Sequence, residues 1–285
     1  MGQAEKEKRR VQEMNLTIRL ESPADYRIVE ELTREAFWKN TDRGVTIDEH
    51  LLVHKLRKSH IFVPDLDYVA EIDGRIVGNV MYSKSKIVAE GKQEYEVLTF
   101  GPLSVLPEYQ NQGVGKALMQ FTITEAKRLG YTAIVFCGEP DYYPRLGFRR
   151  AAEFGLTYAD GGTFDAFMAM ELVPGALCIK GGKFFEDPVF HTMTKEELKA
   201  FDQDFSPKVP RPVVPIDVLL ERLEPAAREA IKNMNLPCLG ELRGRTQREI
   251  ASLPDIDGKA INTIRTVMQE YGRIWGEGGQ VNANH

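Results

Sequence analysis

The sequence predicts an α/β domain with a mixed, splayed central sheet and flanking helices, followed by a small all-α domain. Two observations support this prediction. The stretch from Leu103 to Cys137 reads as a strand end, a glycine-bearing loop, an amphipathic helix and a buried apolar strand, which together form a strand–helix–strand crossover. Beyond residues 206–215, which contain four prolines, apolar residues recur at helical spacing through Trp275.

The helix of this crossover is expected to begin near Val114 and to end at Gly130. Its apolar residues fall at i, i+3, i+4 and i+7, namely Val114, Ala117, Leu118 and Phe121. At its start, the N–H groups of residues 112–116 have no partner within the helix and lie at the positive end of its dipole. Glycine at 113 and 115 lets a bulky anion approach them, so the sequence predicts a diphosphate site.

Two other glycine-loop motifs do not fit this stretch. The dinucleotide fingerprint needs a third small residue where Leu118 stands, and the phosphate loop of NTPases needs glycine at Gln110 and Ser or Thr at Ala117. A tight turn that binds no ligand remains an alternative. Upstream, Gly101-Pro102 interrupts a β-rich segment, and we expect the strand to bulge or to leave its neighbour there, which would free backbone groups for a ligand.

These residues carry a resemblance to a known family. Gln110–Gly115 (QNQGVG) resembles the Q/R-x-x-G-x-G/A motif of the GNAT superfamily of acyl-CoA N-acyltransferases, and Tyr142–Phe148 (YYPRLGF) resembles its later F/Y-Y-x-x-x-G-F segment. The resemblance covers about Leu16 to Leu172, is nearest to the YhbS-like group, and implies the GNAT fold with acetyl-CoA as cosubstrate. It also implies that the diphosphate sits on the loop amides while the pantetheine arm runs beside the preceding strand.

The resemblance assigns roles to particular residues. The predicted acetyl-CoA-binding residues are Leu103, Ser104, Val105, Gln110, Gln112, Gly113, Val114, Gly115 and Lys116. Tyr143 matches the usual general acid for the departing thiolate, against the alternative of a tyrosine at the core edge bonded to backbone; its neighbour Tyr142 is expected to pack. No general base is assigned, because Thr99 occupies the position of the glutamate that some members use. Nearby alternatives are Glu96, Glu139 and Asp141, the last two expected to be solvated.

Composition limits the other possibilities. The 285 residues exceed one typical domain, and a net charge of −5 with a pI near 5.7 argues against binding nucleic acid by bulk electrostatics. We expect a soluble cytoplasmic protein, because no long apolar run or signal sequence is seen and the three cysteines are far apart. We expect no metal: His50 and His54 lie four apart without a third ligand, on an exposed or substrate-lining helix face.

The predicted domain organisation has five parts. They are a charged flexible tail (1–14), the acetyltransferase domain with a C-terminal extension (15–205), a proline-rich linker (206–215), a helix-hairpin-helix domain (216–275) and a flexible tail (276–285). Within the extension, Thr194 and Glu197 predict a capping box that opens a short helix.

The stretch from Gly240 to Ile264 resembles the C-terminal domain of the RNA polymerase alpha subunit. That resemblance implies possible nucleic-acid contacts at Arg245 and Lys259. However, Asp257 stands where phosphate-holding hairpins typically have glycine, and its carboxylate and that of Asp255 would repel a phosphate. These departures favour a protein-contact or pocket-closing module over a DNA-binding one.

The function predicted from the sequence is transfer of an acetyl group from acetyl-CoA to a primary amine by direct attack on the thioester. The acceptor is a small-molecule or peptide amine whose identity the sequence does not specify, and the oligomeric state is open, a homodimer included. The contrasting interpretation is a non-catalytic adaptor or regulator that senses acyl-CoA and contacts DNA or transcription machinery through its C-terminal domain.

Overall fold

The computed structural model describes residues 15–140, 142–245 and 247–272, which form two compact units. Of the described residues, the first unit comprises 15–37 and 48–207, and the second comprises 38–47 and 208–272. The two predicted tails, 1–14 and 276–285, lie outside the described residues.

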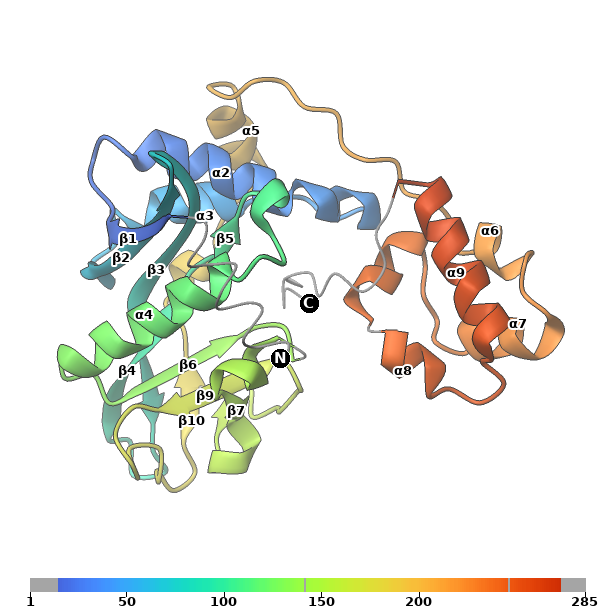
Figure 1. Ribbon diagram of the computed structural model, residues 1–285. Helices are drawn as coiled ribbons and strands as arrows, with labels where there is room; N and C mark the ends of the chain where they lie inside the picture. The colour runs from blue at the N-terminus through green and yellow to red at the C-terminus, as the bar shows by residue number, and fades with distance from the viewer. Residues whose placement is uncertain (1–14, 141, 246, 273–285) are drawn as a thin grey trace. The chain divides into compact units, whose positions relative to one another are not determined.

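The first unit is built on one mixed sheet with the strand order β1-β2-β3-β4-β6-β9-β7 (Figure 1). The strands in that order are β1 (Leu16–Leu20), β2 (Phe62–Ile72), β3 (Arg75–Val88), β4 (Glu94–Phe100), β6 (Ala133–Cys137), β9 (Phe167–Glu171) and β7 (Arg149–Arg150). Three short strands lie off this path: β5 (Ser104–Val105) pairs with β3, and β10 (Lys183–Phe185) pairs with β3 and with β8 (Thr157–Tyr158). The pairs β4–β6 and β8–β10 are parallel, and the others are antiparallel.

The sheet opens between β4 and β6. These strands are paired at Leu98 and Ile134, but β4 ends at Phe100 while β6 continues beside β9 as far as Cys137. On its other side β4 is paired with β3, where Tyr82 of β3 lies opposite Phe100. Further along β3, Asn79 lies opposite Ser104 of β5. The chain therefore advances by four residues from Phe100 to Ser104, while β3 advances by only three from Tyr82 to Asn79. The extra residue forms a bulge at Gly101-Pro102. The predicted interruption of the strand is confirmed.

Helices and the C-terminal extension cover both faces of the sheet. The helices of the first unit are α2 (Tyr26–Trp38, whose last residue is grouped with the second unit), α3 (Glu49–Leu56), α4 (Val114–Arg128) and α5 (Lys195–Asp202). Its 3-10 turns are η2 (Pro107–Tyr109), η3 (Tyr143–Leu146), η4 (Ala151–Phe154) and η5 (Pro188–Phe190). Along β6, Ile134 and Phe136 join the core cluster that includes α4, while Ala133 and Val135 join a second cluster with Leu156 and Phe184 of the extension. Successive side chains of β6 thus face opposite, equally buried layers.

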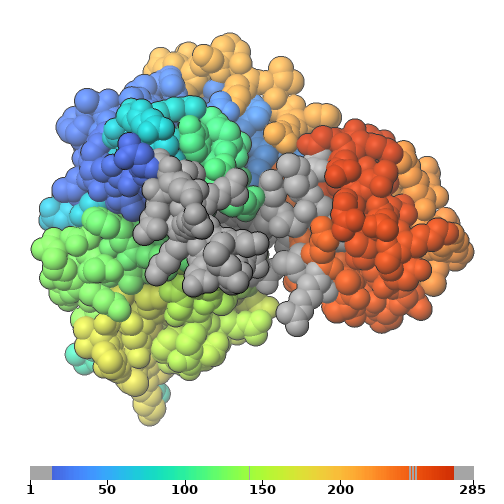
Figure 2. All heavy atoms as spheres, in the orientation of Figure 1, coloured from blue at the N-terminus to red at the C-terminus, as the bar shows by residue number. Residues whose placement is uncertain are grey.

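The second unit is helical and has its own core. Its elements are η1 (Lys39–Arg43), α6 (Asp217–Leu220), α7 (Pro225–Lys232), η6 (Leu239–Gly244), α8 (Gln247–Ala251) and α9 (Gly258–Glu270). Leu219, Ile231, Leu242 and Ile264 are fully buried in one cluster, and the atoms of α6–α9 form one compact body (Figure 2). Pro225 occupies the first turn of α7, where the missing N–H of proline costs no helical hydrogen bond.

A buried ion pair ties the segment between α2 and α3 into this second unit. Within that segment, the carboxylate of Asp42 is 0% exposed and bonds the guanidinium of Arg243, which is 7% exposed. The Thr41 hydroxyl accepts a hydrogen bond from the N–H of Arg211 at 2.8 Å. A Cβ on Gly240 would lie 2.7 Å from a carboxylate oxygen of Asp42, so only glycine fits there. Residues 38–47 are therefore an integral part of the second unit.

We expect Arg243→Ala to lower the stability of the second unit by about 3–5 kcal/mol, because the Asp42 charge would stay buried without its partner. The matched control is Arg222→Ala, since the Arg222–Glu270 pair is 45% and 44% exposed and such pairs contribute about 1 kcal/mol or less. Urea unfolding followed by tryptophan fluorescence measures both, because Trp38 lies in this unit. Equal shifts for the two variants would contradict the importance of the buried pair.

Candidate active site

The start of α4 presents main-chain N–H groups at the open side of its loop. Gly113 precedes the helix with φ +92°, and Asn111 has φ +58°, so two residues of this loop adopt the left-handed conformation. The Ala117 N–H donates to the Gly113 carbonyl at 2.9 Å, and the N–H groups of Val114 and Gly115 come before this bond, without an acceptor in the helix. Within the described residues, the N–H groups of Gln112 and Gly113 donate no hydrogen bond. This arrangement suits an anion.

Side chains of the loop fix its position against β5. The Gln110 amide donates to the Val105 carbonyl at 2.9 Å, and the Gln112 amide donates to the Glu108 carbonyl at 2.5 Å. Both glutamines were predicted to contact the cosubstrate, and the structure shows that their side chains brace the loop. Lys116, in the first turn of α4, is half-buried.

Gly115 has a structural role beyond the one predicted for it. A Cβ at this position would lie 3.1 Å from the hydroxyl oxygen of Tyr142 and 3.5 Å from a Val105 methyl group. Tyr142 therefore does more than pack, because its hydroxyl lies against the start of α4. The motif contains this tyrosine, but no local pattern indicates which way its ring points.

The strand before the loop borders the opening in the sheet. Leu103, Ser104 and Val105 are all buried, and the Ser104 hydroxyl donates to that of Thr33 on α2 at 3.0 Å. Main-chain amides alternate in direction along a strand. Those of this segment that do not face β3 therefore face the side from which β6 has departed.

Tyr143 lies in an aromatic cluster beside the end of β6. Its ring centroid is 4.6 Å from that of Phe136 and 5.7 Å from that of Phe100, and the residue is 4% exposed. Burial raises the pKa of the Tyr143 phenol well above its usual value. No hydrogen bond of its hydroxyl is found within the described part of the chain, so the geometry differs from that of a tyrosine bonded to backbone. The phenol is protonated at neutral pH and able to donate.

The candidate bases occupy different environments. Glu139 is 4% exposed, so the expectation of a solvated carboxylate is wrong: its carbonyl accepts hydrogen bonds from the N–H groups of Tyr142 and Tyr143, and this turn folds it inward. Glu96 is exposed, pairs with Lys84, and lies four residues before the end of β4, about 13 Å along the strand. Thr99 is buried, and Asp141 lies outside the described residues.

The two histidines of α3 do not share an exposed face. His50 is fully buried beneath α5, where its Nε2 lies 3.0 Å from an Asp202 oxygen, so the exposed or substrate-lining placement is wrong for this residue. His54 pairs with Glu30 at 2.9 Å. The cause is the predicted helix α5, whose capping box of Thr194 and Glu197 is confirmed and whose C-terminal end covers α3. Among residues 15–140, 142–245 and 247–272, no group of three metal-binding side chains occurs.

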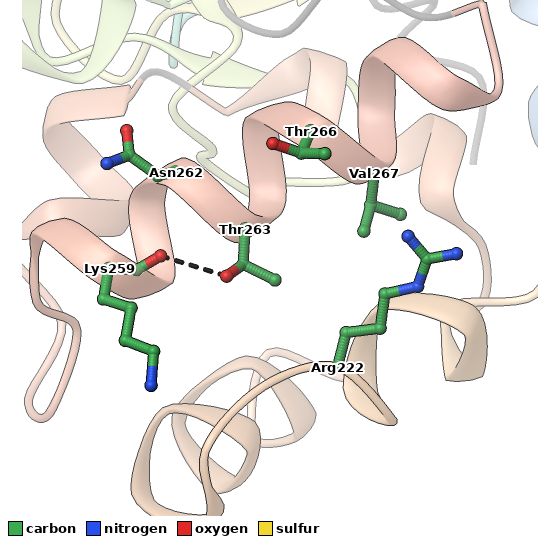
Figure 3. A pocket seen from close by; sticks show the side chains of 6 residues that line it. All are labelled: Arg222, Lys259, Asn262, Thr263, Thr266 and Val267. Carbon is green, nitrogen blue, oxygen red and sulfur yellow. Dashed lines mark hydrogen bonds between the residues drawn. The ribbon is translucent and has the colours of Figure 1, made fainter.

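The second unit contains a shallow pocket of about 500 Å³ beside α9 (Figure 3). Its lining consists of Arg222, Lys259, Asn262, Thr263, Thr266 and Val267. Each cation is already paired, Arg222 with Glu270 at 2.5 Å and Lys259 with Glu224 at 2.7 Å. The Asp257 carboxylate accepts the Ala260 N–H at 2.7 Å and so occupies the start of α9. Arg245 is exposed, but this charge arrangement does not favour a phosphate contact.

Comparison with known proteins agrees with this geometry. Residues 59–150 match the family model of the acetyltransferase (GNAT) domain. This segment is therefore similar to a GNAT acetyltransferase domain. The chain is 29% identical to the uncharacterised N-acetyltransferase YhbS of Escherichia coli K12 over 57% of this chain and 90% of that protein, and 30% identical to YjhQ of the same strain over 35% and 55%. The crystal structure of YhbS in complex with CoA superposes with a TM-score of 0.54 at 28% identity, covering 64% of this chain and 94% of YhbS.

These relationships confirm the GNAT-type α/β fold and the enzyme class, an acyl-CoA-dependent N-acetyltransferase. The helix-hairpin-helix assignment stays a prediction, although α8 and α9 are joined by a short connection as expected. No helix in the described ranges has the length and apolar character needed to cross a membrane.

We expect Gly138→Ala to disturb the aromatic cluster around Tyr143. A Cβ there would lie 2.4 Å from ring carbons of both Phe136 and Tyr143, and such overpacking costs about 1–3 kcal/mol. The melting temperature should fall and the near-ultraviolet circular dichroism of the aromatic rings should change. Gly91→Ala is the control, because nothing lies within 4 Å of its added methyl group. Unchanged spectra in Gly138→Ala would contradict this packing.

Proposed function

We propose that the protein transfers an acetyl group from acetyl-CoA to a primary amine, which attacks the thioester directly. The observation that carries this proposal is the meeting of three features at one place: the amides at the start of α4, the opening between β4 and β6, and the phenol of Tyr143. The crystal structure of YhbS, a complex with CoA, supports the choice of cosubstrate.

The residues present fit a CoA thioester. The N–H groups of residues 112–115 and the dipole of α4, a helix of 15 residues, favour the diphosphate. Amides of the Leu103–Val105 segment that face away from β3 would hydrogen-bond the pantetheine arm and the thioester oxygen. Preorganised donors of this kind contribute on the order of 3 kcal/mol each where an oxyanion forms.

In this mechanism Tyr143 acts as the general acid. The amine forms a C–N bond with the thioester carbon, the C–S bond breaks, and the thiolate takes the phenol proton. The nitrogen then loses its surplus proton to solvent, and Tyr143 regains a proton from solvent. A phenol whose pKa is raised by burial remains protonated until the thiolate forms. No loss of activity from Tyr143 ionisation is therefore expected at or below the usual phenol pKa of about 10.

We expect Tyr143→Phe to lower kcat by about 10²-fold or more, as removal of a general acid does, with little change in the Kd for CoA. Release of CoA thiol measures the first quantity and calorimetry the second. Tyr131→Phe, which lies beyond the C-terminal end of α4, is the control. Full turnover in Tyr143→Phe across a pH series would falsify the assignment.

We expect Gly113→Ala to weaken CoA binding by about tenfold, because a Cβ is disfavoured at its φ of +92° by about 1–2 kcal/mol and the loop amides would reorient. Gly130→Ala makes a matched control. Gly130 follows the other end of α4 with φ +87°, so the backbone strain is the same but the anion site is remote. Equal Kd values for the two variants in calorimetry would count against the diphosphate site.

A panel of primary amines, amino acids, polyamines and lysine peptides, with CoA thiol release as readout, tests the proposed function as a whole. Absence of heat with both CoA and acetyl-CoA would overturn it.

We propose that the second unit serves the transferase by holding residues 38–47, through which α2 and α3 are connected. The buried Asp42–Arg243 pair supports this role. The adaptor interpretation gains no support from Arg245 and Lys259, since Lys259 is paired with Glu224. A cytoplasmic location remains part of this proposal, as does the five-part domain organisation with its linker at 206–215, except that residues 38–47 belong with the second unit.

A further inference from the structure

A histidine, a glutamate and a tyrosine of the first unit form a hydrogen-bonded group outside the residues assigned above. One oxygen of Glu186, Oε2, accepts the hydroxyl of Tyr158 at 2.7 Å and lies 3.1 Å from Nε2 of His191. The Glu186 side chain is 8% exposed, whereas the His191 side chain is 48% exposed. A buried carboxylate thus orients an imidazole that is open to solvent.

The imidazole is held from several sides. His191 directly follows η5, and its N–H donates to the Pro188 carbonyl at 2.9 Å. Val189 and Phe190 of η5 pack against the main core. Because Nε2 faces Glu186, Nδ1 is the ring nitrogen left facing outward, and within the described residues it makes no hydrogen bond.

This group lies at the end of β6, on the sheet face opposite Tyr143. Phe136 contacts the Tyr143 ring, so the next residue, Cys137, faces the other side of the sheet. On that side, Cys137 pairs in register with Phe167, whose ring lies 5.6 Å from that of Tyr158. Burial and the nearby negative charge of Glu186 raise the pKa of the Cys137 thiol, which disfavours its thiolate form. The two groups therefore flank the same strand end, where β4 and β6 part.

The chemistry of the group matches the step for which no base was assigned. A base works best when its conjugate acid has a pKa near the working pH and when a third group orients it. The hydrogen bond to Glu186 raises the pKa of His191. Around Tyr158 lie Cys137, Asp160 and Lys183 of β10, whose Nζ would be 3.9 Å from a Cβ on Gly161. The carboxylate of Glu186, at 3.1 Å from the imidazole, favours a cation here.

We propose, on the basis of the proposed acetyltransferase activity, that Glu186 and His191 form the acceptor site, which takes a primary alkylammonium group and deprotonates it through His191 Nδ1. The ammonium gives one proton to Nδ1 and becomes a neutral amine. Its lone pair forms the C–N bond as the C–S bond breaks. The second nitrogen proton leaves to solvent, while the thiolate is protonated by Tyr143, which regains its proton from solvent.

The test uses the full chain with acetyl-CoA and two probe amines. 1,5-Diaminopentane has primary amines and no carboxylate, whereas glutamate has one amine and two carboxylates. In His191→Gln, kcat/KM for diaminopentane should fall on the order of 10²-fold, as loss of a general base does, while the CoA Kd stays unchanged. His60→Gln is the matched control. His60 is a neighbouring histidine near a carboxylate, 3.8 Å from Asp187, but 84% exposed.

The pH dependence separates a catalytic role from a structural one. A base must be unprotonated, so kcat/KM falls as the pH drops through its pKa. Glu186→Gln removes the group that raises this pKa, and the acidic limb of the profile should therefore move to lower pH. Any one of three results would overturn the inference. They are a wild-type kcat/KM in His191→Gln, an acidic limb of the pH profile that does not move in Glu186→Gln, and a preference of the enzyme for glutamate over diaminopentane.

A binding measurement distinguishes this inference from the proposed function. The imidazole C–H resonance of His191, assigned by its loss in His191→Gln, should shift when diaminopentane is added to the CoA-bound protein. If CoA binds but no amine is acetylated, the proposed function fails. If diaminopentane leaves this resonance unmoved, the acceptor site fails, whether or not acetylation is seen.

Discussion

The structure of the first unit depends on one constraint, the separation of two parallel strands in the middle of a buried sheet. Backbone N–H and C=O groups inside a protein need hydrogen-bond partners. Beyond Leu98 and Ile134, β6 leaves β4, and the two strands no longer supply partners for each other's backbone groups. A ligand that carries amide groups can complete such a ladder. The bulge at Gly101-Pro102 and the loop before α4 follow from keeping this gap open, since both redirect the chain without closing it.

The same gap explains why aromatic residues gather at one end of the sheet. Phe100, Phe136, Tyr143 and Phe148 fill the space beside the strand ends with rigid rings, and Gly138 is small so that two of these rings can meet. On the opposite face the C-terminal extension provides a second layer through Phe184 and Leu156. The end of β6 thus lies between two well-packed layers, which fix the orientations of the side chains around it.

Much of the first unit was predictable because its signals are local. The start of α4 and the capping box at Thr194 each depend on a few adjacent residues. The burial of His50 was not predictable, because α5 covers it from more than 140 residues away in the chain. The same holds for Glu186 and His191, which lie between β10 and α5 and meet Tyr158 only through the tertiary fold. Local patterns cannot show which distant side chains a tertiary fold brings together.

The placement of residues 38–47 changes what it means to detach the C-terminal part of this protein. Within the described residues the chain passes from one unit to the other at 37–38, 47–48 and 207–208, which makes three backbone connections. A protease cut within the proline-rich segment would sever one of the three. The C-terminal fragment would then remain associated, because it binds residues 38–47 between α2 and α3. In a chain truncated at the proline-rich segment, the polar and apolar surface of residues 38–47 would be exposed to solvent.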